Sequence, residues 1–423
     1  MSRSARSGSR DRGAFDVLIV GAGHAGVQVA ASLAHSFEGS IGVLSGELCE
    51  PYEKPPLTKG FLNGAVTESE LLLRPSAFWQ ESGVTLLLDR RVATVDPDAH
   101  VVVTVQGERF GYGRLVWAAG ADPIRIGLPG VDLPGVHELR TLEDTVRFRA
   151  EIRPGKKVVV IGGGYVGLEA ASACVKLGAE VTIVEARSRL LARVTGAEVA
   201  EYVLRRHLDH GAHVELDAAV TGIAETDGRA GGVLLSDGRD IPADVVLVSV
   251  GIQPNTGVLA AAGARCSNGI EVDLQGRTSL PDVYAAGDCT CFPGDDGGSV
   301  RLESLQNAVE QGEIVAKSIM GEDATYGVVP YFWSNQYDIK IKTIGLFTEH
   351  DETIVRTGSG SSAFSVVYLR NGRVCAVDSI NAMKDYVDAR QVLGARIAPS
   401  AVLDPAVRLR DAIVADPAGD VPS

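Results

Sequence analysis

The sequence lacks any continuous apolar run close to the ~20 residues that cross a bilayer, so we expect no membrane-spanning segment. It also lacks an excess of positive charge. The formal net charge of the 423 residues is −14, which argues against a general nucleic-acid-binding protein. The N-terminal segment MSRSARSGSRDRG has no apolar core, unlike a secretory signal. Residues 1–13 are therefore predicted to be a disordered tail.

The cysteines include no C-x-x-C pair, the spacing found in many metal and redox sites. In a chain of this size, isolated cysteines are typical of buried thiols in the reducing cytoplasm, which is the location we expect. No residue is assigned as a metal ligand. The six cysteines are Cys49, Cys174, Cys266, Cys289, Cys291 and Cys375.

Glycine, in contrast, is abundant. The chain has 49 glycines and a hydrophobic content of 45%, which favours a globular α/β protein with many tight turns. A chain of 423 residues is too long for a single hydrophobic core. We therefore expect two or three domains.

The first glycine motif follows the apolar residues 17–20, which predict a buried strand. Gly21, Gly23 and Gly26 have the G-x-G-x-x-G spacing, and a helix-like run comes next. The first glycine permits the tight turn, the second lets the backbone approach a pyrophosphate, and the third lets helix pack on strand. Glu47 follows about 20 residues later, where an acid can hold a ribose hydroxyl.

The same pattern occurs a second time. A strand predicted at residues 158–161 leads into Gly162, Gly164 and Gly167, and a second strand ends at Glu185. Two such units in one chain are far more specific than one. They predict two bound dinucleotides, and the natural pair is a flavin and a nicotinamide dinucleotide.

The acid at position 185 also favours one nicotinamide cofactor. A carboxylate accepts hydrogen bonds from the ribose hydroxyls and repels the 2′-phosphate of NADP, so NADH is favoured. Arg187 and Arg189 lie just beyond and leave NADPH open.

The last part of the sequence changes character. Strand-like runs follow one another from about residue 331, and Asn371-Gly372 is a strong hairpin signal between two of them. A helix is predicted over residues 384–394, and another begins near Ser304. The C-terminal part is therefore predicted to be a separate α+β domain.

Several motifs, taken together, resemble the FAD-dependent, NADH-using reductases of small ferredoxins. This family includes putidaredoxin reductase, rubredoxin reductase and the ferredoxin reductases of bacterial oxygenases. The motifs are VGAGHAG, YEKPPLTKGFL, LLLRP, VIGGGYVGLEAA, VSVGIQPN, VYAAGDC, ESLQNAVEQG and FWSNQYDIKIKTIG, and they extend over nearly all of the chain.

The resemblance implies an α/β fold with two Rossmann-like dinucleotide-binding domains, in the three-layer ββα form of flavin disulfide reductases, plus a C-terminal α+β domain. The FAD-binding domain would comprise residues 14–137 and 250–328. The NAD-binding domain would be inserted at residues 138–249, and the C-terminal domain would span residues 329–423.

The resemblance also implies the cofactor-binding residues. Asp288 would bind the ribityl chain, and the helix that begins near Leu305 would direct its positive end at the flavin. Arg125 would reach the flavin phosphates, although the run GADPIRIG departs from the family pattern in having Asp122 next to the proline. The residues for FAD are Gly21, Gly23, Ala25, Gly26, Glu47, Lys59, Val92, Arg125, Asp288 and Leu305. Those for NAD are Gly162, Gly163, Gly164, Tyr165, Val166, Gly167, Glu185 and Gly251.

Three residues are candidates for the catalytic site by the same resemblance. Lys59 and Glu169 would form an ion pair beside flavin N5, and Trp333 would cover the flavin where the electron acceptor approaches. Simpler interpretations remain open: a surface lysine, a carboxylate on a helix surface and a core tryptophan.

The resemblance implies a [2Fe–2S] ferredoxin as partner, which would pass electrons to a cytochrome P450 or another oxygenase. Because such ferredoxins are acidic, docking requires a local positive patch, for which Arg74, Lys342 and Arg390 are candidates. Each of them can equally be an ordinary solvated charge. We expect a monomer.

Two other functions remain open. An NAD(P)H oxidase or a disulfide-type reductase would need a reactive cysteine. Cys49 is the candidate for the former, whereas Cys289 and Cys291 are too close in sequence for an unstrained disulfide. A redox-controlled signalling flavoprotein of the apoptosis-inducing-factor type would need a basic binding surface, and the acidic balance argues against it.

Overall fold

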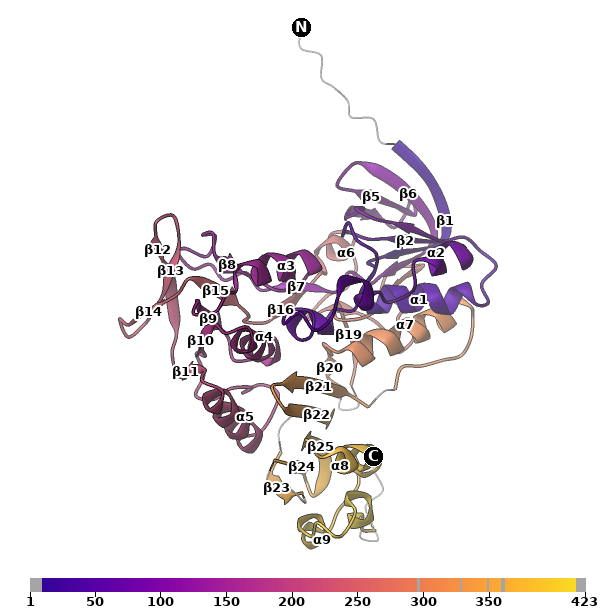
Figure 1. Ribbon diagram of the computed structural model, residues 1–423. Coiled ribbons are helices and arrows are strands. Elements are labelled where there is room, and N and C mark those ends of the chain that lie inside the picture. Colours follow the sequence, from indigo (N-terminus) through magenta and orange to yellow (C-terminus); the bar gives the residue numbers. More distant parts are fainter. Residues whose placement is uncertain (1–9, 295–296, 328, 348–349, 359–361, 416–423) are drawn as a thin grey trace. The chain divides into compact units, whose positions relative to one another are not determined.

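A computed structural model of the chain describes residues 10–294, 297–327, 329–347, 350–358 and 362–415 (Figure 1). The described chain forms two compact units. The first contains residues 10–55, 67–122 and 252–327, and the second contains residues 56–66, 123–251 and 329–415. Each is described by itself.

The first unit is built on a sheet with the strand order β3-β2-β1-β6-β5-β4, in which β18 also pairs with β6. The pairs β1–β2, β2–β3, β1–β6 and β6–β18 are parallel. The pairs β4–β5 and β5–β6 are antiparallel. The strands are β1 (Arg10–Val20), β2 (Ile41–Leu44), β3 (Val84–Leu87), β4 (Val92–Asp96), β5 (Val101–Thr104), β6 (Glu108–Trp117) and β18 (Val283–Ala285).

Helices α1 (His24–Ala34) and α7 (Leu305–Ile319) pack against each other beside this sheet (Figure 1). A Cβ atom at Gly312 would lie 2.8 Å from the carbonyl oxygen of Ala25, so glycine is what allows the two helices to approach so closely. Shorter elements complete the unit or lie at its borders: η1 (Pro55–Thr58), η2 (Glu68–Leu71), α2 (Ala77–Glu81), β7 (Ala121–Pro123), β16 (Ile252–Pro254), α6 (Gly257–Ala261), β17 (Ile270–Glu271), β19 (Thr290–Pro293) and β20 (Ser299–Val300).

The N-terminal boundary differs from the prediction. Strand β1 begins at Arg10 and not near residue 14, with Arg10 opposite Glu108 and Ala14 opposite Gly111. The prediction of a disordered tail is therefore wrong for residues 10–13, because the long strand β6 offers these residues a backbone to pair with. The rest of the predicted tail lies outside the described residues.

The second unit repeats the same plan. Its parallel sheet has the order β11-β10-β9-β15-β8, and β12, β13 and β14 form an antiparallel layer. The prediction of two Rossmann-like domains is confirmed. The elements are β8 (Val136–His137), α3 (Leu142–Glu151), β9 (Lys157–Ile161), α4 (Tyr165–Lys176), β10 (Glu180–Val184), α5 (Ala197–Asp209), β11 (His213–Glu215), β12 (Val220–Thr226), β13 (Arg229–Leu235), β14 (Asp240–Pro242) and β15 (Val245–Val248).

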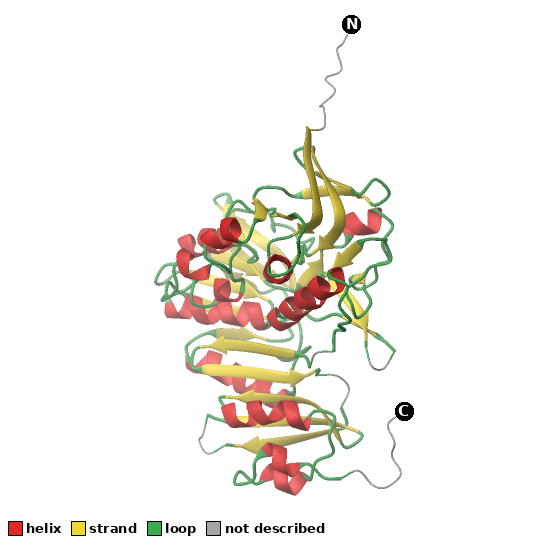
Figure 2. Ribbon diagram, turned by 90° about the vertical axis from the view of Figure 1, so that its right-hand side faces the viewer, coloured by secondary structure: helices red, strands yellow, loops and turns green. Residues whose placement is uncertain are grey.

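The C-terminal part of the second unit is an antiparallel sheet with helices beside it, as predicted (Figure 2). Its strand order is β21-β22-β25-β24-β23. Asn371 (φ 54°) and Gly372 (φ 72°) form the predicted two-residue turn, in which both residues need a positive φ. The elements are β21 (Tyr331–Gln336), β22 (Ile339–Gly345), β23 (Glu352–Thr357), β24 (Phe364–Arg370), β25 (Arg373–Ile380), α8 (Met383–Val392), α9 (Pro399–Leu403) and η3 (Leu409–Ala412).

The division into two units leaves the three domain boundaries given above as a prediction. Within the described ranges, none of the helices combines the length and the apolar character that a bilayer crossing needs.

Candidate functional site

The turn between β1 and α1 has the shape of a phosphate cradle. Gly21 has φ +105°, and a Cβ atom there would lie 2.2 Å from the carbonyl oxygen of Ala118. A Cβ atom at Gly26 would lie 1.9 Å from the carbonyl oxygen of Gly21, whereas one at Gly23 would meet nothing within 4 Å. Gly23 caps α1 without a side-chain hydrogen bond. The cradle therefore presents backbone N–H groups and open space, which fits the pyrophosphate of FAD.

The turn between β9 and α4 has the same construction. Gly162 has φ +113°, and its Cβ would lie 2.1 Å from the carbonyl oxygen of Ser249. A Cβ at Gly167 would lie 2.3 Å from the carbonyl oxygen of Gly162, and one at Gly164 would again meet nothing. Gly164 caps α4 without a side-chain hydrogen bond. This second cradle fits the pyrophosphate of a nicotinamide dinucleotide.

Gly164→Ala is expected to raise the KM for NADH about tenfold, equivalent to about 1.4 kcal/mol, because the added methyl group fills the space that the pyrophosphate needs. The backbone there (φ −84°, ψ 177°) suits any residue, so stability should not change. Steady-state rates with ferricyanide as electron acceptor measure the KM. Gly127→Ala, also into open space but outside both motifs, is the control. Equal KM values for the two variants would contradict the assignment.

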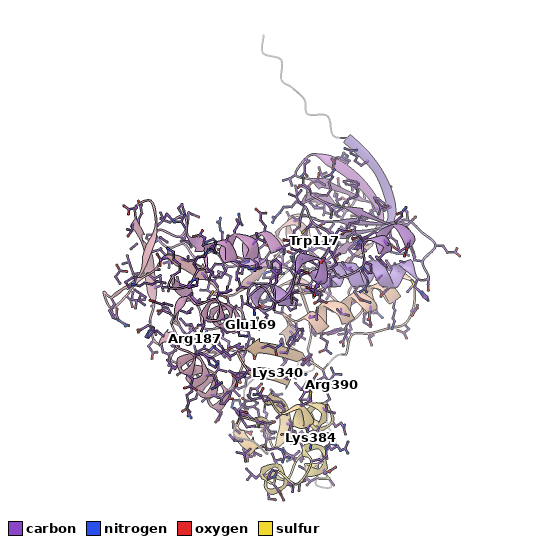
Figure 3. All side chains as sticks on the ribbon, in the orientation of Figure 1. Trp117, Glu169, Arg187, Lys340, Lys384 and Arg390 are labelled. Carbon is purple, nitrogen blue, oxygen red and sulfur yellow. The ribbon has the colours of Figure 1, made fainter. Side chains whose placement is uncertain are left out.

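Glu185 lies beyond the end of β10 and faces the second cradle. The N–H of Gly163 donates to its Oε2 (2.8 Å), and the N–H of Arg187 donates to its Oε1 (2.9 Å). The guanidinium of Arg189 donates to the carbonyl oxygens of Ala192 (3.1 Å) and Thr195 (2.6 Å). Arg189 is thus engaged by its own loop, whereas Arg187 is exposed (Figure 3). Of the two arginines, only Arg187 is therefore available to pair with the 2′-phosphate of NADPH.

Glu185→Gln is expected to raise the ratio of kcat/KM for NADPH to that for NADH about tenfold, because the amide no longer repels a 2′-phosphate. The amide oxygen can still accept from the N–H of Gly163, whereas the bond from the N–H of Arg187 is lost, so a thermal melt is recorded alongside the kinetics. Glu180→Gln makes the same change at the exposed opposite end of β10 and should leave the ratio unchanged. An unchanged ratio in Glu185→Gln would overturn the role of this carboxylate.

Glu47 follows β2 and is held differently. The Tyr52 hydroxyl donates to its Oε2 (2.5 Å), and the Lys54 ammonium lies 2.6 Å from its Oε1. Neither partner was predicted from the sequence, although both lie within seven residues of Glu47. Glu47 is only partly buried, and its contact with a ribose hydroxyl stays a prediction.

Lys59 and Glu169 form the predicted ion pair, within the second unit. The ammonium of Lys59 lies 2.6 Å from Glu169 Oε2, and the Thr58 hydroxyl donates to the same oxygen at 2.6 Å. The Ser334 hydroxyl donates to Oε1 at 2.7 Å. The Glu169 side chain is 4% exposed, which rules out a carboxylate on a helix surface, and that of Lys59 is 19% exposed. Such a buried carboxylate requires its cation and its hydroxyl donors.

The other residues predicted for FAD lie in different surroundings. Ala25 and Val92 are buried, and Leu305 is the first residue of α7, which Ser304 caps by accepting from the N–H of Asn307. Asp288 is half-buried. The side chain of Arg125 is 81% exposed and lies 3.7 Å from Asp132, in the second unit. The role of Arg125 at the flavin phosphates stays a prediction.

Two residues that the sequence analysis missed support the first unit. Gln311 accepts from the N–H of Gly287 (2.7 Å) and from the Thr290 hydroxyl (2.9 Å), and thereby fixes the loop that carries Asp288. Trp117, labelled in Figure 3, donates from its indole nitrogen to the carbonyl oxygen of Asn255 at 2.9 Å. Gln311 is part of the motif ESLQNAVEQG, but its role in fixing the Asp288 loop follows only from its contacts with Gly287 and Thr290.

Two of the cysteines considered for redox roles, Cys289 and Cys49, are not activated. Burial raises the pKa of Cys289 to about 12. Burial, reinforced by the charge of Glu47, also raises the pKa of Cys49 above its ordinary value. All six cysteines are free thiols. Neither of the two cysteines therefore has the thiolate character of a redox or peroxide-reactive site.

Comparison with known proteins identifies the family of the chain. Residues 15–312 match the pyridine nucleotide-disulphide oxidoreductase family, and residues 331–413 match the reductase C-terminal family. The chain is 45% identical to the 5,5'-dehydrodivanillate O-demethylase ferredoxin reductase subunit of Sphingobium sp., over 90% of this chain and 93% of the relative. It is 34% identical to putidaredoxin reductase CamA of Pseudomonas putida, over 95% and 97% of the two chains.

The fold is similar to that of a solved structure, the covalent putidaredoxin reductase-putidaredoxin complex. The TM-score is 0.90 at 33% identity, with 94% of this chain and 97% of that chain covered. The cofactors of reductases of this kind are FAD and NAD(H), as the sequence predicts. The chain belongs to the pyridine nucleotide-disulphide oxidoreductase family and carries that family's nucleotide-binding fold together with a reductase C-terminal domain.

Proposed function

We propose that this protein is a flavoprotein reductase that passes electrons from NADH through FAD to a [2Fe–2S] ferredoxin, which in turn supplies a cytochrome P450 or another oxygenase. The observation that carries the proposal is the pair of phosphate cradles, each with an open second glycine, in one chain. The names of the relatives, an O-demethylase ferredoxin reductase subunit and putidaredoxin reductase, support ferredoxin as the acceptor.

When bound, FAD accepts a hydride from NADH and releases the electrons singly. The residues of the chain hold the two dinucleotides and set the local charge. The N-termini of α1 and α4 bind the pyrophosphates, and Glu185 binds the adenosine ribose of NADH. The Lys59–Glu169 pair would act at the reactive edge of the flavin, as the family resemblance implies. The N-terminus of α7 stabilises negative charge at the pyrimidine end.

The acceptor docks, in this proposal, on the exposed face of α8. Helix α8 carries two acids and two bases, but the acids are buried: Asp385 pairs with Arg356, and Asp388 pairs with Arg408. Lys384 and Arg390 remain exposed, together with the apolar side chains of Met383 and Val387. The exposed face is therefore positive, although the helix as a whole is neutral.

The neighbouring strand extends this basic face. Lys340 is exposed on β22, and the ammonium of Lys342 lies over the ring of Tyr386, 4.2 Å from its centroid. Figure 3 labels Lys340, Lys384 and Arg390 in the C-terminal part of the second unit. Trp333 is half-buried on β21 and stacks on Tyr331 at 5.6 Å. Arg74, the third predicted docking residue, bonds instead to Leu73 and Gln28 in the first unit.

Replacing Lys384 and Arg390 together by glutamine is expected to raise the KM for an acidic ferredoxin about tenfold at low salt and to flatten its dependence on salt. Arg370→Gln, at an exposed arginine next to the β24–β25 turn, is the control. The measurement is ferredoxin-dependent cytochrome c reduction between low and physiological ionic strength. A KM equal to that of the control would exclude α8 as the docking face.

The function is tested by mixing the purified yellow protein anaerobically with NADH and following the bleaching of the flavin. Fast bleaching, slow reoxidation by air and fast reoxidation by a [2Fe–2S] ferredoxin are expected. Fast reoxidation by oxygen alone would support an oxidase. A long-lived reduced flavin–NAD complex that ferredoxin does not reoxidise would support a signalling flavoprotein. We also propose a cytoplasmic location, which the free thiols favour.

A further inference from the structure

A continuous chain of buried hydrogen bonds leads away from Glu169 through the second unit. Beyond Ser334, the amide nitrogen of Gln336 donates to the Ser334 hydroxyl oxygen at 3.0 Å. The amide oxygen of Gln336 lies 2.9 Å from His207 Nε2, and the Tyr337 hydroxyl lies 3.3 Å from His207 Nδ1. Ser334 and His207 are 0% exposed and Gln336 is 1% exposed. Water therefore does not substitute for the bonds from Ser334 to His207, whereas the Tyr337 hydroxyl at the far end is partly buried.

Donors and acceptors can alternate along this series of hydrogen bonds in one direction only, with each group donating toward Glu169. Ser334 has a single proton, and since its oxygen accepts from Gln336, that proton goes to Glu169. Gln336 can present its nitrogen to Ser334 only if its oxygen faces a donor, which requires a proton on His207 Nε2. His207 Nδ1 is then the acceptor for the Tyr337 hydroxyl.

The opposite tautomer would break the chain at Glu169. With the proton on Nδ1, His207 Nε2 becomes an acceptor and Gln336 must turn its amide around. The Gln336 oxygen would then face Ser334, whose proton would be drawn away from Glu169. Burial lowers the pKa of His207 to about 4, so the ring is neutral near pH 7 and its tautomer is the variable that matters.

We propose that Tyr337, His207, Gln336 and Ser334 are positioning residues that hold a proton donor on Glu169, so that the C-terminal strand β21 and helix α5 set the state of the Lys59–Glu169 pair. The proposal rests on the proposed function of that pair. The C-terminal sheet would then contribute to reduction of the flavin by NADH. This contribution is separate from docking of the electron acceptor.

Other titratable groups lie near Glu169, and they define the background against which a pH effect is measured. Lys59 comes from the segment 56–66. Tyr165 lies on the same helix as Glu169, and its pKa is raised by burial and by the charges of Asp378 on β25 and of Glu169. His210 stacks on Tyr337 with ring centroids 3.9 Å apart, and its charge also lowers the pKa of His207. All of these residues are retained in the Ser334 and His207 variants.

The first test is the pH profile of flavin reduction by NADH in the holoenzyme. Ser334→Ala removes the hydroxyl donor of Glu169 Oε1, so the acid limb of the rate profile should move to higher pH. His207→Phe should move it in the same direction, whereas His207→Gln, which retains a donor near the Nε2 position, should stay close to the wild-type profile. Ser379→Ala deletes a buried hydroxyl with no hydrogen-bond partner among the described residues, in the same sheet, and serves as control.

The second test does not depend on activity. Nitrogen-15 NMR of histidine-labelled protein should show His207 as the neutral Nε2–H tautomer, assigned by the loss of its signals in His207→Gln. An Nδ1–H tautomer would overturn the proposal, and so would a wild-type pH profile in folded Ser334→Ala. If Glu169→Gln changes the profile but Ser334→Ala does not, only the positioning chain is wrong. If Glu169→Gln itself has no effect, the proposed role of the ion pair fails with it.

Discussion

Lys59→Met is expected to slow flavin reduction by NADH about 100-fold and to destabilise the protein by about 3 kcal/mol. The stability loss arises because Glu169, 4% exposed, would retain a buried charge with two hydroxyl donors but without its cation. The rate loss has the size usual for removing one preorganised charge from a reaction site. Methionine keeps the apolar stem of lysine, so packing changes little. Anaerobic stopped-flow and urea unfolding measure the two quantities.

The double variant Lys59→Met, Glu169→Gln separates the two effects. Without either charge the buried site is neutral, so most of the lost stability should return, whereas the rate should stay low. Recovery of the rate together with the stability would mean that the pair has only a structural role. A single variant that reduces its flavin at the wild-type rate would remove Lys59 from the catalytic site altogether.

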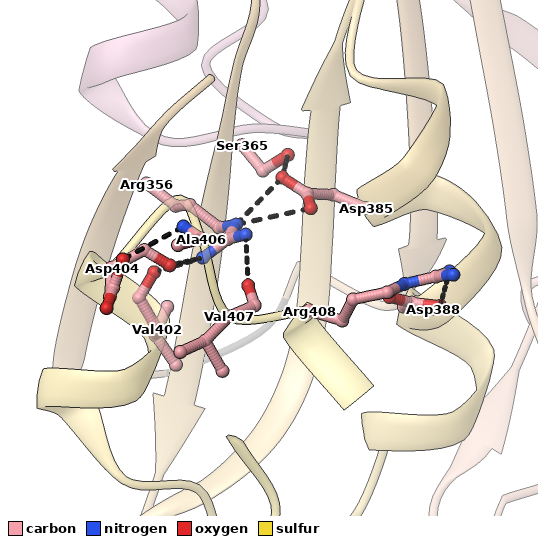
Figure 4. Close-up of polar contacts among 9 residues, drawn as sticks. All are labelled: Arg356, Ser365, Asp385, Asp388, Val402, Asp404, Ala406, Val407 and Arg408. Carbon is pink, nitrogen blue, oxygen red and sulfur yellow. Dashed lines mark hydrogen bonds and ion pairs between the residues drawn. The ribbon is translucent and has the colours of Figure 1, made fainter. Parts of the chain in front are cut away.

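Arg356→Ala is expected to lower the free energy of unfolding by about 3–5 kcal/mol (Figure 4). The guanidinium is buried and contacts both carboxylate oxygens of Asp385, at 3.1 and 3.2 Å. It also donates to the carbonyl oxygens of Val402 (2.7 Å), Asp404 (2.8 Å) and Val407 (2.6 Å). Alanine would leave a buried carboxylate and three carbonyl oxygens without this donor.

Two matched variants make this prediction specific. Arg356→Lys keeps the charge but cannot reach all four partners at once, so an intermediate loss is expected. Arg205→Ala removes an exposed arginine that pairs with Glu201 within α5 and should cost less than about 1 kcal/mol. If Arg356→Ala were no more destabilising than Arg205→Ala, the contacts of Arg356 with Asp385 and with residues 402–407 would not hold that segment to the sheet.

Local spacing was a reliable guide wherever a steric requirement acts within a few residues. The glycines of both cradles follow such requirements, since a Cβ at Gly26 or Gly167 would collide with the carbonyl oxygen of a glycine five residues earlier. The Asn371-Gly372 turn and the Ser304 cap are equally local. The family resemblance added Lys59 and Glu169, which the structure brings into contact.

The sequence was a poor guide where partners are distant. It did not indicate that Arg10 and Asp11 pair with β6. Nor did it distinguish the two acids of α8, which are buried and paired, from the two bases, which are exposed. Charge patterning along a helix gives its net charge, but only packing decides which charges face the solvent.

The amino-acid sequence by itself determined two dinucleotide cradles, the carboxylate that faces the second of them, and an α+β C-terminal domain. Tertiary structure alone decided how the Lys59–Glu169 pair is completed, because Ser334 is 165 residues from Glu169 and His207 is 129 residues from Gln336. Glycine motifs can be recognised in the sequence because their steric requirement acts within a single backbone turn. A buried series of hydrogen bonds depends on which segments come into contact when the protein folds. Because those segments are far apart in sequence, no short-range pattern predicts the contacts.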